Sequence, residues 1–424
     1  MPEINYFAAT DYRAQRKVFG IKREDRRLHM YVIGRTGMGK TSLLLNMILN
    51  DIHGDEGVCF IDPHGDAVEK LLDYIPPFRV EDVIYLNPAD TAHPIPLNIL
   101  ENTASEHRHL LVSGVISVFR KLFAEHWQHR QEHILRNCLL TLLERQERMT
   151  LFDVYRLLTD WRYRKEVVTG VKDPVLEAFW KHEFSKYVYQ FKGEALAPIQ
   201  NKIGAFLTSP IIRNLIGQPE CRINFREAMD SGKILLVNLA KGRMGEDAAS
   251  FLGSLIVLKL QLAATSRVEV PEDARRDFYL YIDEFQTFVA SEGLDHILSE
   301  ARKYRLNLTL AHQYLGQLED RLREAIFGNV GTVVAFPVGP ENGDTLQTHF
   351  SPRVRTEDLI NQDRHHIYLK LAIDGKMSQP FSATTLPPMH RFPCQGTASA
   401  VIEASRRRYA GSDQRPKTNL HLFL

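Results

Sequence analysis

The stretch Gly34–Ser42 reads GRTGMGKTS and matches the pattern G-x-x-x-x-G-K-[ST]. One apolar run, MYVI, precedes it, and another, SLLLNMIL, follows it. This order predicts a buried strand, a glycine-rich turn and a helix, with successive backbone N–H groups facing phosphate oxygens. We therefore expect the chain to fold around a nucleotide phosphate site.

Each residue of this turn has an expected role. Lys40 reaches the β- and γ-phosphate oxygens, and Thr41 offers its hydroxyl to Mg²⁺. The glycines let the backbone curl closely around the phosphates. The residues expected to contact ATP are Gly34, Thr36, Gly37, Met38, Gly39, Lys40, Thr41 and Ser42.

A second motif, FYLYIDE, occupies Phe278–Glu284. An apolar strand that ends in two acids places them at the carboxyl edge of the sheet, where α/β folds bind ligands. We expect Asp283 to hold Mg²⁺ through water and Glu284 to polarise the attacking water. Acids often follow buried strands, so the motif gains its weight from its position after the phosphate-binding turn.

Polar residues also end two other apolar runs. Gln313 follows LNLTLAH and is expected to touch the γ-phosphate or the attacking water, with a solvated strand end as the alternative. Asp62 and His64 follow VCFI and point to the same edge. His64 fits a loop histidine as well as a phosphate contact.

Short apolar runs separated by helical stretches predict an α/β fold with a largely parallel sheet. Two later runs, 365–373 and 379–385, predict a hairpin that completes the core. The six expected core strands are 29–34, 58–62, 234–240, 278–283, 306–311 and 332–336.

Helical periodicity replaces the strand pattern between the second and third of these runs, which predicts an all-helical domain inserted at 103–225. The flanking parts, 29–102 and 226–387, are expected to form one α/β core. Residues 1–28 are interpreted as a basic N-terminal segment and residues 388–424 as a basic, extended tail.

The chain has a net charge of only +1, so any polyanion site must be local. Its four cysteines form no CxxC pair, which argues against a zinc knuckle and a disulfide framework. No apolar run approaches the roughly 20 residues that span a bilayer, and the N-terminus lacks a signal peptide. We expect a soluble, cytoplasmic protein without a transmembrane segment.

Together these motifs resemble the HerA–FtsK superfamily of ring-forming DNA-pumping ATPases, in particular the soluble region of type IV secretion (conjugative) coupling proteins. The resemblance covers residues 20–390 and implies a RecA-like core with an all-helical insertion. It also implies a homo-hexamer around DNA, with ATP at subunit interfaces completed by a neighbour's arginine. The segments that carry it are HMYVIGRTGMGKTSLL, VCFIDPHGD, VNLAKGRMGED, FYLYIDEFQTF and ARKYRLNLTLAHQ.

The resemblance singles out basic residues. Arg302 aligns with an arginine that precedes the sensor strand in relatives, and Arg27 is a second candidate for reaching across the interface. Both also fit ordinary surface arginines. Lys241 and Arg243 follow the third strand and are candidates for non-specific DNA phosphate contacts, with Arg406–Arg408 of the tail next in line. Solvated charges are the alternative for each.

The expected function is an ATP-driven DNA translocase. Two rivals remain open: a secretion ATPase that moves protein, and a nucleotide-gated ring that serves as scaffold for a partner nuclease. Coupling proteins usually carry N-terminal membrane helices and HerA relatives an N-terminal β-barrel, neither of which is visible here. Membrane recruitment by a partner, DNA polarity and strandedness, and the pathway therefore stay open.

Overall fold

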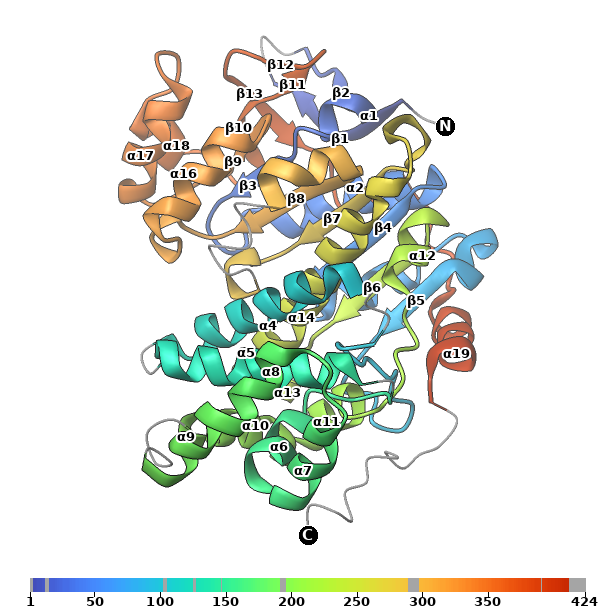
Figure 1. Cartoon of the computed structure of the whole chain (residues 1–424). Coiled ribbons are helices and arrows are strands. Elements are labelled where there is room, and N and C mark those ends of the chain that lie inside the picture. The colour runs from blue at the N-terminus through green and yellow to red at the C-terminus, as the bar shows by residue number, and fades with distance from the viewer. Residues whose placement is uncertain are drawn as a thin grey trace. The chain divides into compact units, whose positions relative to one another are not determined.

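The computed structural model describes residues 3–11, 15–101, 105–124, 127–145, 147–190, 196–288, 297–389 and 391–411 (Figure 1). The chain divides into two compact units, which are described separately. The first comprises Met1–Leu86, Arg226–Ala240 and Ala263–Ser405. The second comprises Asn87–Phe225, Lys241–Leu262 and Arg406–Leu424.

The first unit is built on an eleven-stranded sheet. Its strands lie side by side in the order β2-β1-β13-β10-β9-β3-β8-β7-β4-β6-β5. The strands from β9 to β5 run parallel, and most are buried on both faces, which explains their continuous apolar sequences. The predicted α/β class is confirmed. The parallel strands are β3 (Met30–Ile33), β4 (Gly57–Asp62), β5 (Val83–Leu86), β6 (Ile234–Asn238), β7 (Phe278–Ile282), β8 (Leu306–His312) and β9 (Thr332–Ala335).

The other side of the sheet is antiparallel. The two late runs form β10 (His366–Lys370) and β13 (Phe381–Thr385), which pair with each other. Residues interpreted only as a basic segment contribute β1 (Ile4–Thr10), which pairs with β13, and the edge strand β2 (Val18–Lys22). The remaining elements here are α1 (Arg23–Arg26), β11 (Ala372–Ile373) and β12 (Lys376–Met377).

Helices cover the sheet of the first unit. Residues of α2 (Lys40–His53) and α3 (Asp66–Leu72) share one hydrophobic cluster with residues of most strands. The cluster's members are fully or almost fully buried, as a close-packed core requires. Further elements are α12 (Phe225–Asp230), η10 (Ala301–Tyr304), α16 (Asp320–Asn329), α17 (Pro340–Phe350) and α18 (Thr356–Ile360).

The C-terminal region differs from the expected extended tail, because residues 398–409 form the helix α19 (Ala398–Tyr409). Val401 belongs to the core cluster, and the Thr397 hydroxyl donates to the carbonyls of Leu72 and Ile75 at 3.0 and 2.8 Å. The Ser405 hydroxyl accepts from the backbone N–H of β5 at Tyr85, 2.9 Å away. Residues 412–424 lie outside the described part of the chain.

The second unit is helical and includes residues 103–225, together with residues 87–102, which were expected in the α/β core. Phe251 stacks on Phe206 with ring centroids 3.9 Å apart and meets Phe119 edge-on at 5.7 Å. Residues 241–262, expected in the α/β core, therefore group with the insertion. Its helices are α4 (Arg108–Leu122), α5 (His129–Glu144), α6 (Asp153–Thr159), α7 (Trp161–Thr169), α8 (Pro174–Ala178), α9 (Phe184–Gln190), α10 (Ala197–Thr208), α11 (Pro210–Ile216), α13 (Lys241–Met244) and the first part of α14 (Glu246–Thr265).

One segment among the described residues, Glu246–Glu269, is long and apolar enough to cross a membrane, with a mean hydropathy of 1.5 over its best window. That window is 78% buried inside the protein. Core helices of soluble proteins have the same length and composition, so this segment is weak evidence for a membrane span.

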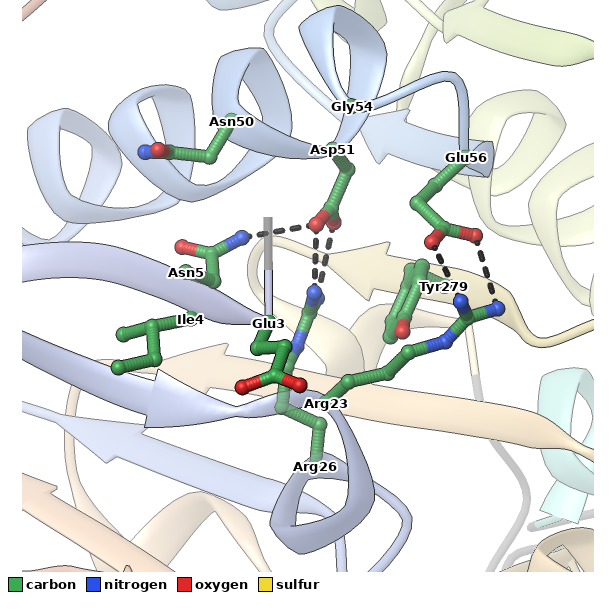
Figure 2. Close-up of a pocket in the computed structure, with 10 residues that line it drawn as sticks. All are labelled: Glu3, Ile4, Asn5, Arg23, Arg26, Asn50, Asp51, Gly54, Glu56 and Tyr279. Atoms are coloured by element: carbon green, nitrogen blue, oxygen red, sulfur yellow. Dashed lines mark hydrogen bonds and ion pairs between the residues drawn. The ribbon is translucent and has the colours of Figure 1, made fainter. Parts of the chain in front are cut away.

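A buried polar network ties the N-terminal residues to α2 (Figure 2). The Arg26 guanidinium donates to both carboxylate oxygens of Asp51, at 2.5 and 2.8 Å, and lies over the Tyr279 ring at 3.6 Å. Asp51 also accepts from the Asn5 amide at 2.8 Å and from the Tyr281 hydroxyl at 2.5 Å. One carboxylate therefore joins β1, α1, α2 and β7.

Replacing Asp51 with Ala should destabilise the protein by about 3–5 kcal/mol, because it leaves the buried Arg26 charge without its partner. Urea unfolding followed by circular dichroism measures this. Lys22→Ala is the control, since its ion pair with Asp374 is exposed on both sides, and its unfolding midpoint should not move. Equal stability of Asp51→Ala and the parent protein would contradict the role assigned to the network.

Candidate active site

The glycine-rich turn follows β3 at the carboxyl edge of the parallel strands. It is anchored on both sides, since Gly34 N–H donates to the His312 carbonyl at 3.3 Å and Arg35 N–H to the Pro337 carbonyl at 2.9 Å. Gly39 has a φ of +120°, and a Cβ there would lie 2.6 Å from Nδ1 of His365. Backbone conformation and space both demand glycine at this position.

Lys40 and Thr41 lie together at the start of α2. The Lys40 ammonium is buried and donates to the Gly34 and Arg35 carbonyls at 2.7 and 3.3 Å. Burial lowers the pKa of Lys40, while the charges of Asp283 and Glu284 act in the opposite direction. A cation held in this way is suited to phosphate oxygens.

Asp283 ends β7 and accepts a hydrogen bond from the Thr41 hydroxyl at 3.1 Å. Burial and the charge of Glu284 raise the pKa of Asp283 to about 6, although Lys40 opposes the shift. Mg²⁺ is commonly bound by one or two protein oxygens together with water and substrate phosphates. The adjacent hydroxyl and carboxylate fit that chemistry, and Thr41 with Asp283 remains the predicted Mg²⁺ pair.

Glu284 is held by two neutral amides. Gln313 donates to its Oε1 at 2.8 Å, and Gln286 donates to its Oε2 at 2.9 Å. Gln313 reaches it because β8 lies between β3 and β7 in the sheet. The Glu284 backbone has a φ of +48°, a conformation that non-glycine residues adopt mostly where the surroundings impose it.

Two residues of this site, Gln286 and His312, were not predicted from the sequence. Gln286 had a local signal, since it follows the acid pair by two residues. His312 is fully buried beneath the turn, and its Nδ1 lies 3.1 Å from the Tyr31 hydroxyl. Its ring also meets Phe285 at 5.1 Å. Burial, with the nearby Lys40 charge, lowers the pKa of His312 to about 3, so the ring is a neutral packing element beside Gln313.

Asp62 has a structural task at the same edge. Its carboxylate accepts from the backbone N–H groups of His64, Ala67 and Val68 at 2.9, 2.9 and 3.2 Å. These bonds satisfy free donors at the start of α3. His64 itself is exposed.

The two candidate interface arginines lie at the opposite edge of the sheet. Arg27 precedes β3 and donates to both Asp277 oxygens, at 3.1 and 2.8 Å. Arg302 precedes β8, is exposed, and has no side-chain hydrogen bond or ion pair to any described residue. The seven residues of β8 separate it from Gln313, roughly 20 Å at about 3.3 Å per residue. Arg302 is therefore outside its own chain's site.

The candidate DNA-contacting residues belong to the second unit. Arg243 is exposed and Lys241 is partly exposed, both in α13. Neither side chain has a hydrogen bond or ion pair within the described part of the chain. Arg406 differs, because it forms an ion pair with Asp90 at 2.8 Å.

A phosphate-binding turn between β3 and α2, an acid pair after β7 and an amide at the tip of β8 define a P-loop nucleotide-binding protein. The sequence matches a family model described as the type IV secretion-system coupling protein DNA-binding domain, over residues 17–347. The chain therefore belongs to this family, and the predicted resemblance to coupling proteins is confirmed. A comparison with curated protein sequences gives no match.

Solved structures share the fold. The bacterial conjugative coupling protein TrwBdeltaN70 is 15% identical with a TM-score of 0.63, covering 94% of this chain and 97% of that one. Plasmid coupling protein TrwB with the ATP analogue ADPNP is 17% identical with a TM-score of 0.62, covering 90% of each chain. VirB4 of Thermoanaerobacter pseudethanolicus is 14% identical with a TM-score of 0.62, covering 91% and 97%.

Lys40→Ala and Glu284→Gln should separate binding from turnover. Loss of the Lys40 cation should weaken ATP binding by about tenfold or more. Glu284→Gln keeps the shape and should bind ATP normally, yet turn over about 100-fold more slowly if Glu284 is the expected base. Titration with a fluorescent ATP analogue and a phosphate-release assay measure the two quantities. Normal turnover by Glu284→Gln would mean that another group is the base.

Proposed function

We propose that this protein is an ATP-driven motor that moves DNA and works as a ring of six identical copies. The observation that carries the proposal is Glu284 held by Gln313 and Gln286 beside Lys40, Thr41 and Asp283, in a chain of the coupling-protein family. Likeness to TrwB structures with ADP and Mg²⁺ or with ATP analogues supports nucleotide as the ligand.

Each residue has a task in hydrolysis. Lys40 and the backbone amides of the turn bind the β- and γ-phosphates. Thr41 and Asp283 would hold Mg²⁺, which supplies positive charge against the phosphates. Glu284 accepts a proton from the attacking water, and Gln313 reports the γ-phosphate by exchanging its bond to Glu284 for one to phosphate.

The ring is proposed because one copy supplies too little positive charge to balance the transition state of hydrolysis. The transition state spreads negative charge over the γ-phosphate oxygens, and one copy supplies only Lys40 and the metal. Arg302 has no side-chain hydrogen bond or ion pair to a described residue and lies at the far edge of the sheet. We infer that this edge faces the nucleotide of the next copy, where Arg302 supplies the missing cation.

DNA is the proposed cargo because of the family and because Lys241 and Arg243 have no ion pair with any described residue. Tracking along any sequence needs phosphate contacts rather than base readout. We place the motor in the cytoplasm. A secretion or nuclease partner would bind it there or recruit it to a membrane. Displacement of a triplex-forming strand in the presence of ATP distinguishes DNA movement from protein transport and from a static scaffold.

Replacing Lys241 and Arg243 with Ala should weaken binding to all DNA sequences about equally. Each lost phosphate contact lowers the salt dependence by roughly 0.9, so the slope of log affinity against log salt should fall by up to about 2. Fluorescence anisotropy at several NaCl concentrations measures it, and DNA-stimulated ATP hydrolysis should fall in parallel. Lys70→Ala with Lys376→Ala is the control for loss of two exposed cations. An unchanged slope would move the DNA surface elsewhere, with Arg406–Arg408 next.

Arg302→Ala should bind ATP almost normally and hydrolyse it on the order of 10³-fold more slowly. Mixing it with Lys40→Ala should restore part of the activity, because some interfaces then join an intact Lys40 to an intact neighbouring Arg302. Phosphate release by the mixture, with mixed rings confirmed by native mass spectrometry, is the measurement. Confirmed mixed rings without rescue would end the trans role and turn attention to Arg27.

A further inference from the structure

The backbone around Arg302 is fixed, although its side chain has no hydrogen bond or ion pair to a described residue. The turn η10 closes with Arg305 N–H donating to the Arg302 carbonyl at 3.1 Å. Ala301, the preceding residue, is buried. A guanidinium on a fixed turn loses less freedom when it binds than one on a mobile loop. The turn therefore holds the Arg302 backbone, from which the side chain extends, in a narrow range of positions.

Three side chains from outside the turn bind carbonyls on either side of Arg302. His29 Nε2 lies 3.2 Å from the Leu298 carbonyl. Arg267, which is fully buried, donates to the Tyr304 carbonyl at 2.9 Å. Arg275 donates to the Lys303 carbonyl. Carbonyls at the end of a short helix lack partners of their own, so these donors determine where the turn lies.

His29 makes the most specific of these contacts. The Leu308 N–H donates to its Nδ1 at 3.2 Å. Since a peptide N–H can only donate, the ring proton is on Nε2 and is given to the Leu298 carbonyl. Burial lowers the pKa of His29 to about 4, opposed by the Leu298 carbonyl and assisted by the charge of Arg302. The neutral ring thus joins the segment before Arg302 to the strand after it.

The His29 backbone is also unusual. Its φ is +63°, in the left-handed region, and its carbonyl accepts from Thr332 N–H at 3.3 Å. Asparagine tolerates this conformation better than most residues, and its side chain is too short to span both partners of the ring. Nothing in the phosphate-binding turn requires an imidazole at the other end of β3. The two hydrogen bonds of the His29 imidazole join it to the Leu298 carbonyl before Arg302 and to the Leu308 N–H in β8.

We propose that His29 is a positioning residue for Arg302: with Arg275 and Arg267, it fixes the turn that presents this guanidinium to the nucleotide of a neighbouring copy. The inference rests on the proposed trans role of Arg302. It adds that the residue before β3, His29, positions the arginine that acts on the neighbouring copy. The turn after β3 binds the phosphates of the copy's own nucleotide. Misplacing a catalytic cation by about 1 Å can cost up to 100-fold in rate.

His29→Asn tests this assignment in DNA-stimulated ATP hydrolysis. We expect ATP affinity and KM to stay within twofold of the parent, and kcat to fall on the order of tenfold. The double variant His29→Asn with Arg302→Ala should be no slower than Arg302→Ala alone, since the positioned group is already gone. His349→Asn is the control: this partly buried histidine stacks on Phe327, away from the turn, and kcat should not change.

Mixed rings show in which copy the defect acts. His29→Asn mixed with Lys40→Ala should exceed the mean activity of the two, because an intact phosphate-binding turn then meets a correctly held Arg302. Absence of such a gain, or losses that multiply in the double variant, would overturn the positioning role while leaving Arg302 in place. Normal turnover by Arg302→Ala would overturn the trans arginine and this inference together.

Arg275→Ala provides a second route if His29→Asn does not fold. Arg275 is partly exposed, and its loss frees the Lys303 carbonyl next to Arg302. The same pattern is expected on a smaller scale, with kcat lowered a few-fold, KM unchanged and rescue by Lys40→Ala. An unchanged kcat in this variant would contradict the proposal that the turn must be held.

Discussion

The buried ion pair between Arg26 and Asp51 sets the position of α2 on the sheet. Asp51 lies near the end of the helix that begins at Lys40, and it accepts from Tyr281, two residues before Asp283. A buried, bidentate pair is directional, because any displacement leaves charge unpaired in a medium of low dielectric constant. Fixing the far end of α2 against β7 also fixes its near end, where Thr41 meets Asp283 at 3.1 Å.

The parallel sheet has a different task at each edge. Its carboxyl edge gathers Lys40, Asp283 and Glu284, whereas its amino edge holds Arg302 and the contacts to the backbone carbonyls around it. β3 and β8 each join the two edges, β3 from His29 to the phosphate-binding turn and β8 from the Arg302 turn to Gln313. In the proposed ring, β3 and β8 would thus connect the nucleotide site of one copy directly to the arginine that acts on the nucleotide of the next copy.

Burial explains which parts could be predicted from the sequence. Strands covered on both faces read as continuous apolar runs, so β3, β4, β6, β7, β8 and β9 were recognisable, whereas β5, which is equally buried, was missed. The edge strand β2 buries only Ile21 fully, and α19 docks through few residues such as Val401, so neither carries a strong pattern. The bond from Gln313 to Glu284 depends on β8 lying beside β7, an order that no local motif specifies, whereas the bond from Gln286 joins residues two apart in the chain.

The partners of the buried acids differ between those with a structural role and those proposed to act in hydrolysis. Asp51 and Asp277 are neutralised by arginines, which suits groups that must stay where they are. Glu284 and Asp283 instead accept hydrogen bonds from amides and a hydroxyl, which orient a carboxylate without cancelling its charge. An arginine in place of Gln286 would hold Glu284 as firmly but would disfavour proton uptake by the carboxylate. Neutral donors therefore suit the role of base that is proposed for Glu284.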